Sequence, residues 1–144
     1  MKRGFTLIEL AVTLFVLALA ISVAAPSLAR GVDTVKARAE TAGIATFLRA
    51  ARERAITHNR ACEVRVNTEA GVIELRAGDT VLAIRRSAPG VRVTFDPPTG
   101  HSVTFLPQGL STGGQLLVEA PGRRMFLVTV DPLTGRVATR RLDT

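Results

Sequence analysis

Residues 5–25 form an apolar run that a single charge, Glu9, interrupts. At about 1.5 Å per residue, a helix of this length extends roughly 31 Å, which matches the hydrocarbon core of a bilayer. We therefore expect a transmembrane helix over residues 5–25. Lys2 and Arg3 precede it, and the positive-inside rule then predicts a cytoplasmic N-terminus and a head on the other side. An ionised carboxylate inside such a helix is costly, so Glu9 is a candidate functional residue that needs a partner.

Beyond Arg30 apolar residues recur at intervals of three and four, which indicates an amphipathic helix over residues 26–57. Pro26 lacks a backbone donor, and we expect it to kink the helix. A sheet should cover the apolar face. The residues expected on that face are Val32, Val35, Ala39, Ala42, Gly43, Phe47, Ala50 and Ala51. Together with the apolar run, this segment predicts one helix of about 50 residues.

Beyond Asn59 the hydrophobic period changes to two, and turn residues recur between the apolar stretches. The pattern predicts about eight short strands in a head over residues 58–144. Their expected ranges are 62–66, 72–76, 81–86, 91–95, 102–106, 115–119, 125–130 and 136–140. Short connections favour antiparallel pairing. The predicted fold class is α+β, with the long N-terminal helix packed on an antiparallel β-rich head of one twisted sheet or two sheets.

Composition argues against most catalytic and metal sites. The chain has no Trp or Tyr, so we expect an aliphatic core. Cys62 is the only cysteine, which excludes a zinc site built on paired cysteines, and we expect it half-buried in a strand. His58 and His101 lack metal-ligand spacing, and Ser111–Gly114 resembles a phosphate cradle only loosely because no helix follows it. We expect no metal, no cofactor and no enzymatic activity.

The net charge is +7, and residues 31–144 carry +5 of it because the ionisable residues of the first 30 positions contribute +2. A basic head leaves contact with nucleic-acid phosphates open. The candidate contacts are Arg136, Arg140 and Arg141, of which the first and second are expected on one face of a strand. No aromatic residue lies between them to stack on bases. An edge strand kept soluble by charge is the alternative that we favour.

The residues Arg3-Gly4-Phe5-Thr6-Leu7-Ile8-Glu9 resemble the processing site of type IV prepilins and the related pseudopilins. The resemblance implies that a membrane peptidase cuts after Gly4, removing a leader of residues 1–4. The new N-terminal residue, Phe5, is then N-methylated. Glu9 can neutralise this amine on a neighbouring subunit as helices stack in a filament, which offsets the cost of burying both charges.

Two simpler readings of the N-terminus compete with this one. A secretory signal cut near Ala18-Leu19-Ala20 would have no use for Glu9, and its apolar stretch would end earlier. A plain single-pass anchor, whose Glu9 stays protonated or reaches the membrane surface, is the other alternative.

Three later segments resemble the H-type minor pseudopilins of type II secretion and their minor-pilin relatives, the GspH/FimT family. They are Phe105-Leu106-Pro107-Gln108-Gly109, Ser111-Thr112-Gly113-Gly114 and Asp131-Pro132-Leu133-Thr134-Gly135-Arg136-Val137. The resemblance covers the whole chain and implies a pilin-like fold. It implies a type II secretion minor pseudopilin, held in the bacterial inner membrane with a periplasmic head, that joins a periplasmic pseudopilus driving protein export.

The partners implied by this resemblance are other major and minor pseudopilins, the prepilin peptidase and the inner-membrane assembly platform. The alternative is a type IV minor pilin of the FimT kind, which acts in pilus assembly or in DNA binding during uptake. Family members thought to bind DNA carry a C-terminal Gly-Arg-x-Arg motif. Here Gly135-Arg136-Val137 is followed by Ala138, so the second arginine is missing at its place.

Overall fold

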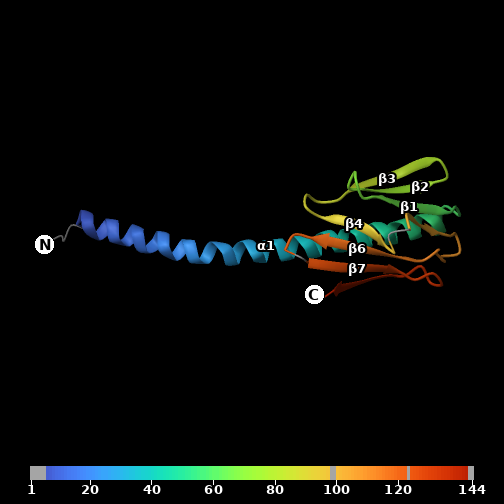
Figure 1. Cartoon of the computed structure of the whole chain (residues 1–144). Coiled ribbons are helices and arrows are strands. Elements are labelled where there is room, and N and C mark those ends of the chain that lie inside the picture. Colours follow the sequence, from blue (N-terminus) through green and yellow to red (C-terminus); the bar gives the residue numbers. More distant parts are fainter. Residues whose placement is uncertain (1–5, 98–99, 123, 143–144) are drawn as a thin grey trace. The chain divides into compact units, whose positions relative to one another are not determined.

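The computed structural model of the chain describes residues 6–97, 100–122 and 124–142, with backbone only at residues 24–30 and 32. Two compact units make up the chain, residues 1–35 and 36–144. Helix α1 (Leu7–Thr57) contributes to both units, and all the described strands belong to the second unit, the head (Figure 1). The predicted long N-terminal helix and β-rich head are confirmed.

In the first unit, Thr6 fixes the start of α1. The N–H of Glu9 donates to the carbonyl of Thr6 at 3.1 Å and to its hydroxyl oxygen at 3.3 Å. A threonine that precedes an acid by three positions is a capping sequence, because it satisfies donors that the first helical turn leaves unpaired. The backbone is helical through Pro26. The kink expected there stays a prediction.

Two four-stranded antiparallel sheets build the head, in the orders β3-β2-β1-β5 and β4-β6-β7-β8. Their strands are β1 (Cys62–Asn67), β2 (Val72–Ala77), β3 (Thr80–Arg86), β4 (Arg92–Asp96), β5 (Ser102–Phe105), β6 (Gly114–Ala120), β7 (Arg124–Val130) and β8 (Val137–Leu142). Each predicted strand is present within two residues of its expected bounds, and two sheets form rather than one. Figure 1 shows both sheets beside the C-terminal part of α1.

The core of the head is mostly aliphatic, as composition predicts, with Phe95, Phe105 and Phe126 buried in it as well. Alternate residues of β2 are buried, namely Ile73, Leu75 and Ala77, because successive side chains of a strand point to opposite faces. Phe105 is the one aromatic residue among the largest fully buried side chains of the described part. The remaining large buried side chains come from both sheets and from α1, so a single core joins all three layers.

The buried face of α1 differs from the predicted one. The buried residues are Ala37, Thr41, Ile44, Ala45, Leu48, Ala51 and Ala55. The Val32 side chain lies outside the described residues. Among the other predicted residues only Ala51 is fully buried: Gly43 and Phe47 are partly buried, Val35 is 67% exposed, and Ala39, Ala42 and Ala50 are exposed as well. At about 100° per residue, the true stripe lies on nearly the opposite side of the helix. The prediction was wrong because alanines occur all round this helix and their spacing alone selects no face.

An ion pair ties β3 to α1. Arg85 Nη2 lies 3.0 Å from Glu40 Oε2, and the N–H of Ala88 donates to the other oxygen of the same carboxylate at 3.3 Å. The arginine passes over Gly43, where an added Cβ would lie 2.8 Å from Arg85 Cζ. A glycine at this position therefore makes room for the guanidinium, and the edge strand is fixed against the helix.

The C-terminus of α1 closes in a Schellman motif. The N–H of Arg60 donates to the carbonyl of Ala55 at 3.1 Å, and the N–H of Asn59 donates to that of Ile56 at 3.3 Å. Asn59 has a φ of 48°, the left-handed conformation that this motif requires and that asparagine tolerates. The motif turns the chain directly into β1 and fixes the place of Arg60.

Candidate functional site

Glu9 is the one predicted processing or assembly residue whose side chain the structure describes; Gly4 and Phe5 lie outside the described residues, as does the Pro26 side chain. The Glu9 side chain is exposed in the first turn of α1. Within the described residues its carboxylate has no cationic group at ion-pair distance. An acid at a helix N-terminus is favourably placed with respect to the helix dipole.

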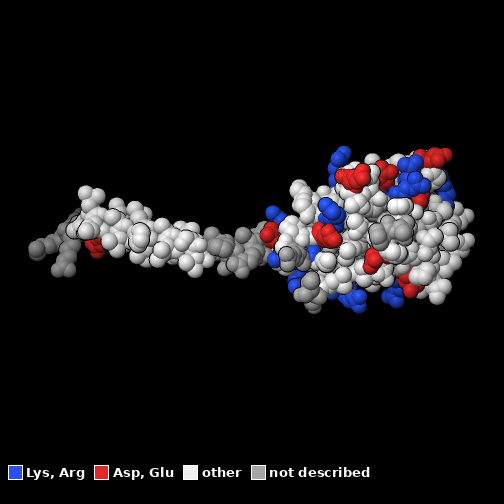
Figure 2. Space-filling model, viewed as in Figure 1, with Lys and Arg blue, Asp and Glu red and all other residues white. Residues whose placement is uncertain are grey.

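The side chains of residues 6–23 are all exposed, including large ones such as Leu7 at 88% and Phe15 at 70%. Figure 2 shows this part of the helix as an almost uncharged surface. A contiguous apolar surface of this kind marks a site of contact with protein or lipid. The membrane span expected over residues 5–25 extends beyond these described side chains. Within the part of the chain that the structure describes, no helix is long and apolar enough to cross a membrane.

In the head, two of the segments with family resemblance pack against each other. The N–H of Ser111 donates to the carbonyl of Pro132 at 3.0 Å, and the Ser111 hydroxyl donates to that of Asp131 at 2.9 Å and accepts the N–H of Gly113 at 3.0 Å. The N–H and hydroxyl of Thr134 donate to the Asp131 carboxylate, which lowers the pKa of this acid. These polar groups are used within the fold, and Ser111 is neither an exposed nucleophile nor part of a phosphate cradle.

Arg52 of α1 joins the same contact from the helix side. Its Nε donates to the carbonyl of Gly109 at 3.1 Å. Gly135 is buried with a φ of 61°, and an added Cβ there would lie 2.7 Å from Arg52 Nε. Arg52 of α1 thus contacts both the loop at Gly109 and the turn at Gly135. The sequence gives no signal for this contact, because its members are far apart along the chain.

The candidate DNA contacts fall into two places. β8 begins at Val137, so Arg136 lies in the preceding turn and not on the strand where we expected it. It lines a hollow of about 560 Å³ with Arg49 and Arg52 of α1, and Arg49 Nη2 donates to the Val137 carbonyl at 3.2 Å.

Arg140 and Arg141 lie on β8, an edge strand of the second sheet, and line a separate hollow of about 230 Å³ with Arg38 of α1. The expectation that Arg136 and Arg140 share one strand face is therefore wrong. The helix arginines beside both hollows were not among the predicted contacts. Figure 2 shows acidic and basic side chains interspersed over the visible face of the head.

Cys62 begins β1 and is 2% exposed, more deeply buried than the half-buried position expected. Burial raises the pKa of its thiol, and the charges of Arg60 and Arg54 act in the opposite sense. Among the described residues no three His, Cys, Asp or Glu side chains are placed to hold a metal ion.

Two different family profiles match the N-terminal part and the rest of the chain. The profile of the prokaryotic N-terminal methylation motif matches residues 1–25, and the profile described as type II transport protein GspH matches residues 40–134. No curated protein sequence matches the chain.

Two solved proteins share the fold. The type IV minor pilin FimU of Pseudomonas aeruginosa aligns with a TM-score of 0.62 at 12% identity, covering 74% of this chain and 98% of FimU. The minor pseudopilin EpsH from the type 2 secretion system of Vibrio cholerae aligns with a TM-score of 0.54 at 16% identity, covering 76% of this chain and 95% of EpsH. At these identities the likeness establishes the pilin-like fold predicted from the sequence.

Proposed function

Because this chain belongs to the GspH family of type II transport proteins, a family of pilin-like structural subunits, we propose that it is a minor pseudopilin of a type II secretion system. In this proposal, residues 5–25 hold the precursor in the inner membrane with the head in the periplasm. Cleavage after Gly4 and methylation of Phe5 prepare the chain for entry into a periplasmic pseudopilus with other pseudopilins. The methylation-motif profile over residues 1–25 supports methylation at this N-terminus.

Glu9 carries the proposal. Its carboxylate is exposed, has no described partner within the chain, and lies at the end of an apolar surface that needs a covering partner. An uncompensated carboxylate among apolar helices is unfavourable, and pairing with the amine of a neighbouring subunit removes most of that penalty. Glu9 would then fix the axial position of one subunit against the next and would take no part in catalysis.

Glu9→Gln and Glu9→Leu test this role in cells that carry the secretion system. Gln keeps the shape and the backbone capping by Thr6 but removes the charge, whereas Leu also removes the polar group. Both are expected to abolish incorporation of the chain into the pseudopilus and to reduce export, measured by cross-linking to other pseudopilins and by secreted protein. Glu53→Gln, at an exposed acid later on α1, is the matched control and should leave both readouts unchanged. Normal assembly of the Glu9→Leu variant would falsify the mechanism.

A second function, DNA contact by a type IV minor pilin, has one observation in its favour. The β8 arginines and Arg136 adjoin arginines of α1, so arginines line both hollows at this edge, together with the acid Glu53 in the hollow beside Arg136. Phosphate binding depends on such clusters and weakens steeply with salt.

A gel shift of the full chain in detergent tests the DNA reading. If these arginines bind phosphates, retention of duplex DNA should fall as salt rises, and Arg140→Ala with Arg141→Ala should weaken it more than Arg92→Ala on β4. Absence of retention at low salt would end this alternative.

A further inference from the structure

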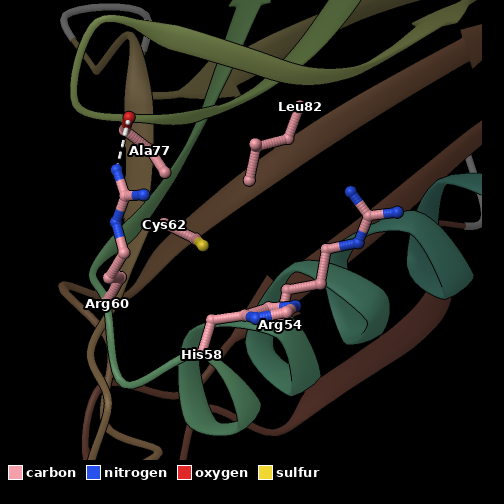
Figure 3. Close-up of a pocket in the computed structure, with 6 residues that line it drawn as sticks. All are labelled: Arg54, His58, Arg60, Cys62, Ala77 and Leu82. Carbon is pink, nitrogen blue, oxygen red and sulfur yellow. Dashed lines mark hydrogen bonds between the residues drawn. The ribbon is translucent and has the colours of Figure 1, made fainter.

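A pocket of about 380 Å³ lies in the head where the end of α1 meets the first sheet, away from the hollows near β8. Its lining residues are Arg54, His58, Arg60, Cys62, Ala77 and Leu82. Figure 3 shows the side chains of Cys62 and Leu82 directed into the space above the helix that carries Arg54 and His58. The inner wall is apolar and the outer wall is basic, so the pocket is amphipathic.

Two local features form this pocket: the Schellman motif at the end of α1 and a bulge between β2 and β3. The Schellman motif at the end of α1 fixes the backbone of Arg60, whose Nη2 donates to the carbonyl of Ala77 at 3.2 Å. The register between β2 and β3 shifts at Leu75/Arg76, and Leu82 has no partner residue in β2. A bulge of this kind turns a side chain away from its regular direction. Here it brings Leu82 to the wall of the pocket with Cys62 and Ala77.

The basic wall lacks acidic partners. Among the described residues, neither Arg54 nor Arg60 has a carboxylate at ion-pair distance, and no acid lines the pocket. Arg54, His58 and Arg60 are exposed at its mouth, while Cys62 and Ala77 are buried at its base. This arrangement suits a ligand that presents a carboxylate beside an apolar group.

The strand that borders the pocket is open on one side. β3 is at an edge of the first sheet, and its side chains Val81, Leu82 and Ile84 are 40%, 39% and 58% exposed. Edge strands are usually protected by charge, as β8 is at the edge of the second sheet by Arg140 and Arg141. The part of this edge from Thr80 to Ile84 carries no charge, and Arg85 and Arg86 come only at the end of the strand. An uncharged edge beside a basic pocket has the features of a surface to which an extended segment adds as a further strand.

We propose that the β3 edge and this pocket together bind an extended segment of a partner protein that carries an acidic residue two positions before an aliphatic one. Residues two apart in a strand lie on the same face. The aliphatic side chain enters the pocket against Cys62, Ala77 and Leu82. The carboxylate pairs with Arg54 at the mouth, and main-chain hydrogen bonds form along β3. Charge complementarity selects the acidic segment.

The test uses the full chain in detergent micelles and a rhodamine-labelled peptide amide of sequence Thr-Glu-Val-Leu-Val-Thr. Fluorescence anisotropy should show saturable binding, weakened about tenfold when Gln replaces the peptide Glu, as loss of one charged contact predicts. Arg54→Glu should abolish binding of this peptide and create binding of the version with Lys in place of Glu. Arg38→Glu, an equal charge change at another exposed helix position, is the matched control and should preserve the peptide preference.

Two further measurements locate the peptide and separate charge loss from misfolding. Since Cys62 is the only cysteine, bound peptide should slow its reaction with a thiol reagent. Leu82→Gln, at a partly exposed position, should weaken binding without changing the melting temperature, so the test stands even if Arg54→Glu fails to fold.

Equal binding of the Glu and Gln peptides, or no binding at about 1 mM peptide, would overturn the proposal, since a millimolar Kd is the weak limit of a specific site. A second result would also overturn it: the chain binds no peptide but self-associates, and Arg54→Glu abolishes that self-association. The occupant of the pocket would then be a second copy of the chain.

Discussion

Gly135 and Gly71 have nearly the same φ angle in very different surroundings. Their φ angles are 61° and 62°, in the left-handed region that side chains disfavour. A Cβ at Gly71 would meet nothing within 4 Å, whereas a Cβ at Gly135 would collide with the backbone carbonyl oxygen of Gly109 and lie 2.7 Å from Arg52 Nε. The pair therefore separates the effect of conformation from the effect of packing.

Gly135→Ala is expected to destabilise the head more than Gly71→Ala. The left-handed conformation costs each alanine roughly 1–2 kcal/mol. Gly135→Ala should add about 1–3 kcal/mol, because the new methyl group displaces Arg52 from its bond to Gly109. Thermal or urea unfolding of the full chain in detergent measures both variants. Equal losses would show that the contacts of Arg52 with this loop and turn contribute little.

At the residue scale, features of neighbouring residues could be predicted from the sequence, whereas contacts between residues far apart in the sequence could not. Glu9 is the one charge in the apolar run over residues 5–25, which is visible without a structure. Glu40 and Arg85 are 45 positions apart, and Arg52 and Gly109 are 57 apart, so only the folded chain brings them together.

At the scale of elements, strands were easier to predict than the buried face of the helix. A period of two with turn residues at both ends restricts each strand, because a shift by one residue would exchange its two faces. Helix α1 contains alanines on all sides, and the large buried residues Ile44 and Leu48 mark the true face. Other large apolar residues of the helix, such as Val35 and Ile56, are exposed, so side-chain size alone does not single out this face either.

Two alanines of α1 test the corrected face. Ala45 is 1% exposed and Ala50 is exposed, so Ala45→Gln and Ala50→Gln make the same change of helix propensity in opposite environments. Ala45→Gln should cost about 2 kcal/mol or more, because it forces a large polar side chain into the core. Ala50→Gln should stay within about 0.5 kcal/mol. Unfolding in urea measures the free energy of unfolding of both variants. A larger loss of stability for Ala50→Gln would mean that the face predicted from the sequence is the buried one.

At the scale of the whole molecule, the division of strands between sheets was not predictable from local pattern. β4 and β5 are neighbours in sequence but lie in different sheets, since β5 pairs with β1 and β4 pairs with β6. Both strands have the same alternation, so the sequence permits either one twisted sheet or two. The partition depends on which faces cover α1, a property of the complete fold.

The whole-molecule prediction concerns the order of processing and assembly. If cleavage after Gly4 exposes the Phe5 amine that Glu9 of a neighbouring subunit neutralises, the two steps respond to different substitutions. Gly4→Val should block cleavage, and intact-mass spectrometry of the purified chain should then show residues 1–4 retained and no added methyl group. Glu9→Gln should still lose residues 1–4 but fail to cross-link to other pseudopilins.

The wild-type chain and Glu53→Gln, which leaves both groups untouched, provide the reference masses and cross-links. Loss of residues 1–4 from Gly4→Val would place the cut elsewhere and remove Phe5 as the amine donor. Assembly of uncleaved Gly4→Val would separate filament entry from the new N-terminus altogether, because a peptide bond at Phe5 has no charge to pair with Glu9. Either result would leave the carboxylate of Glu9 without the partner on which its proposed function depends.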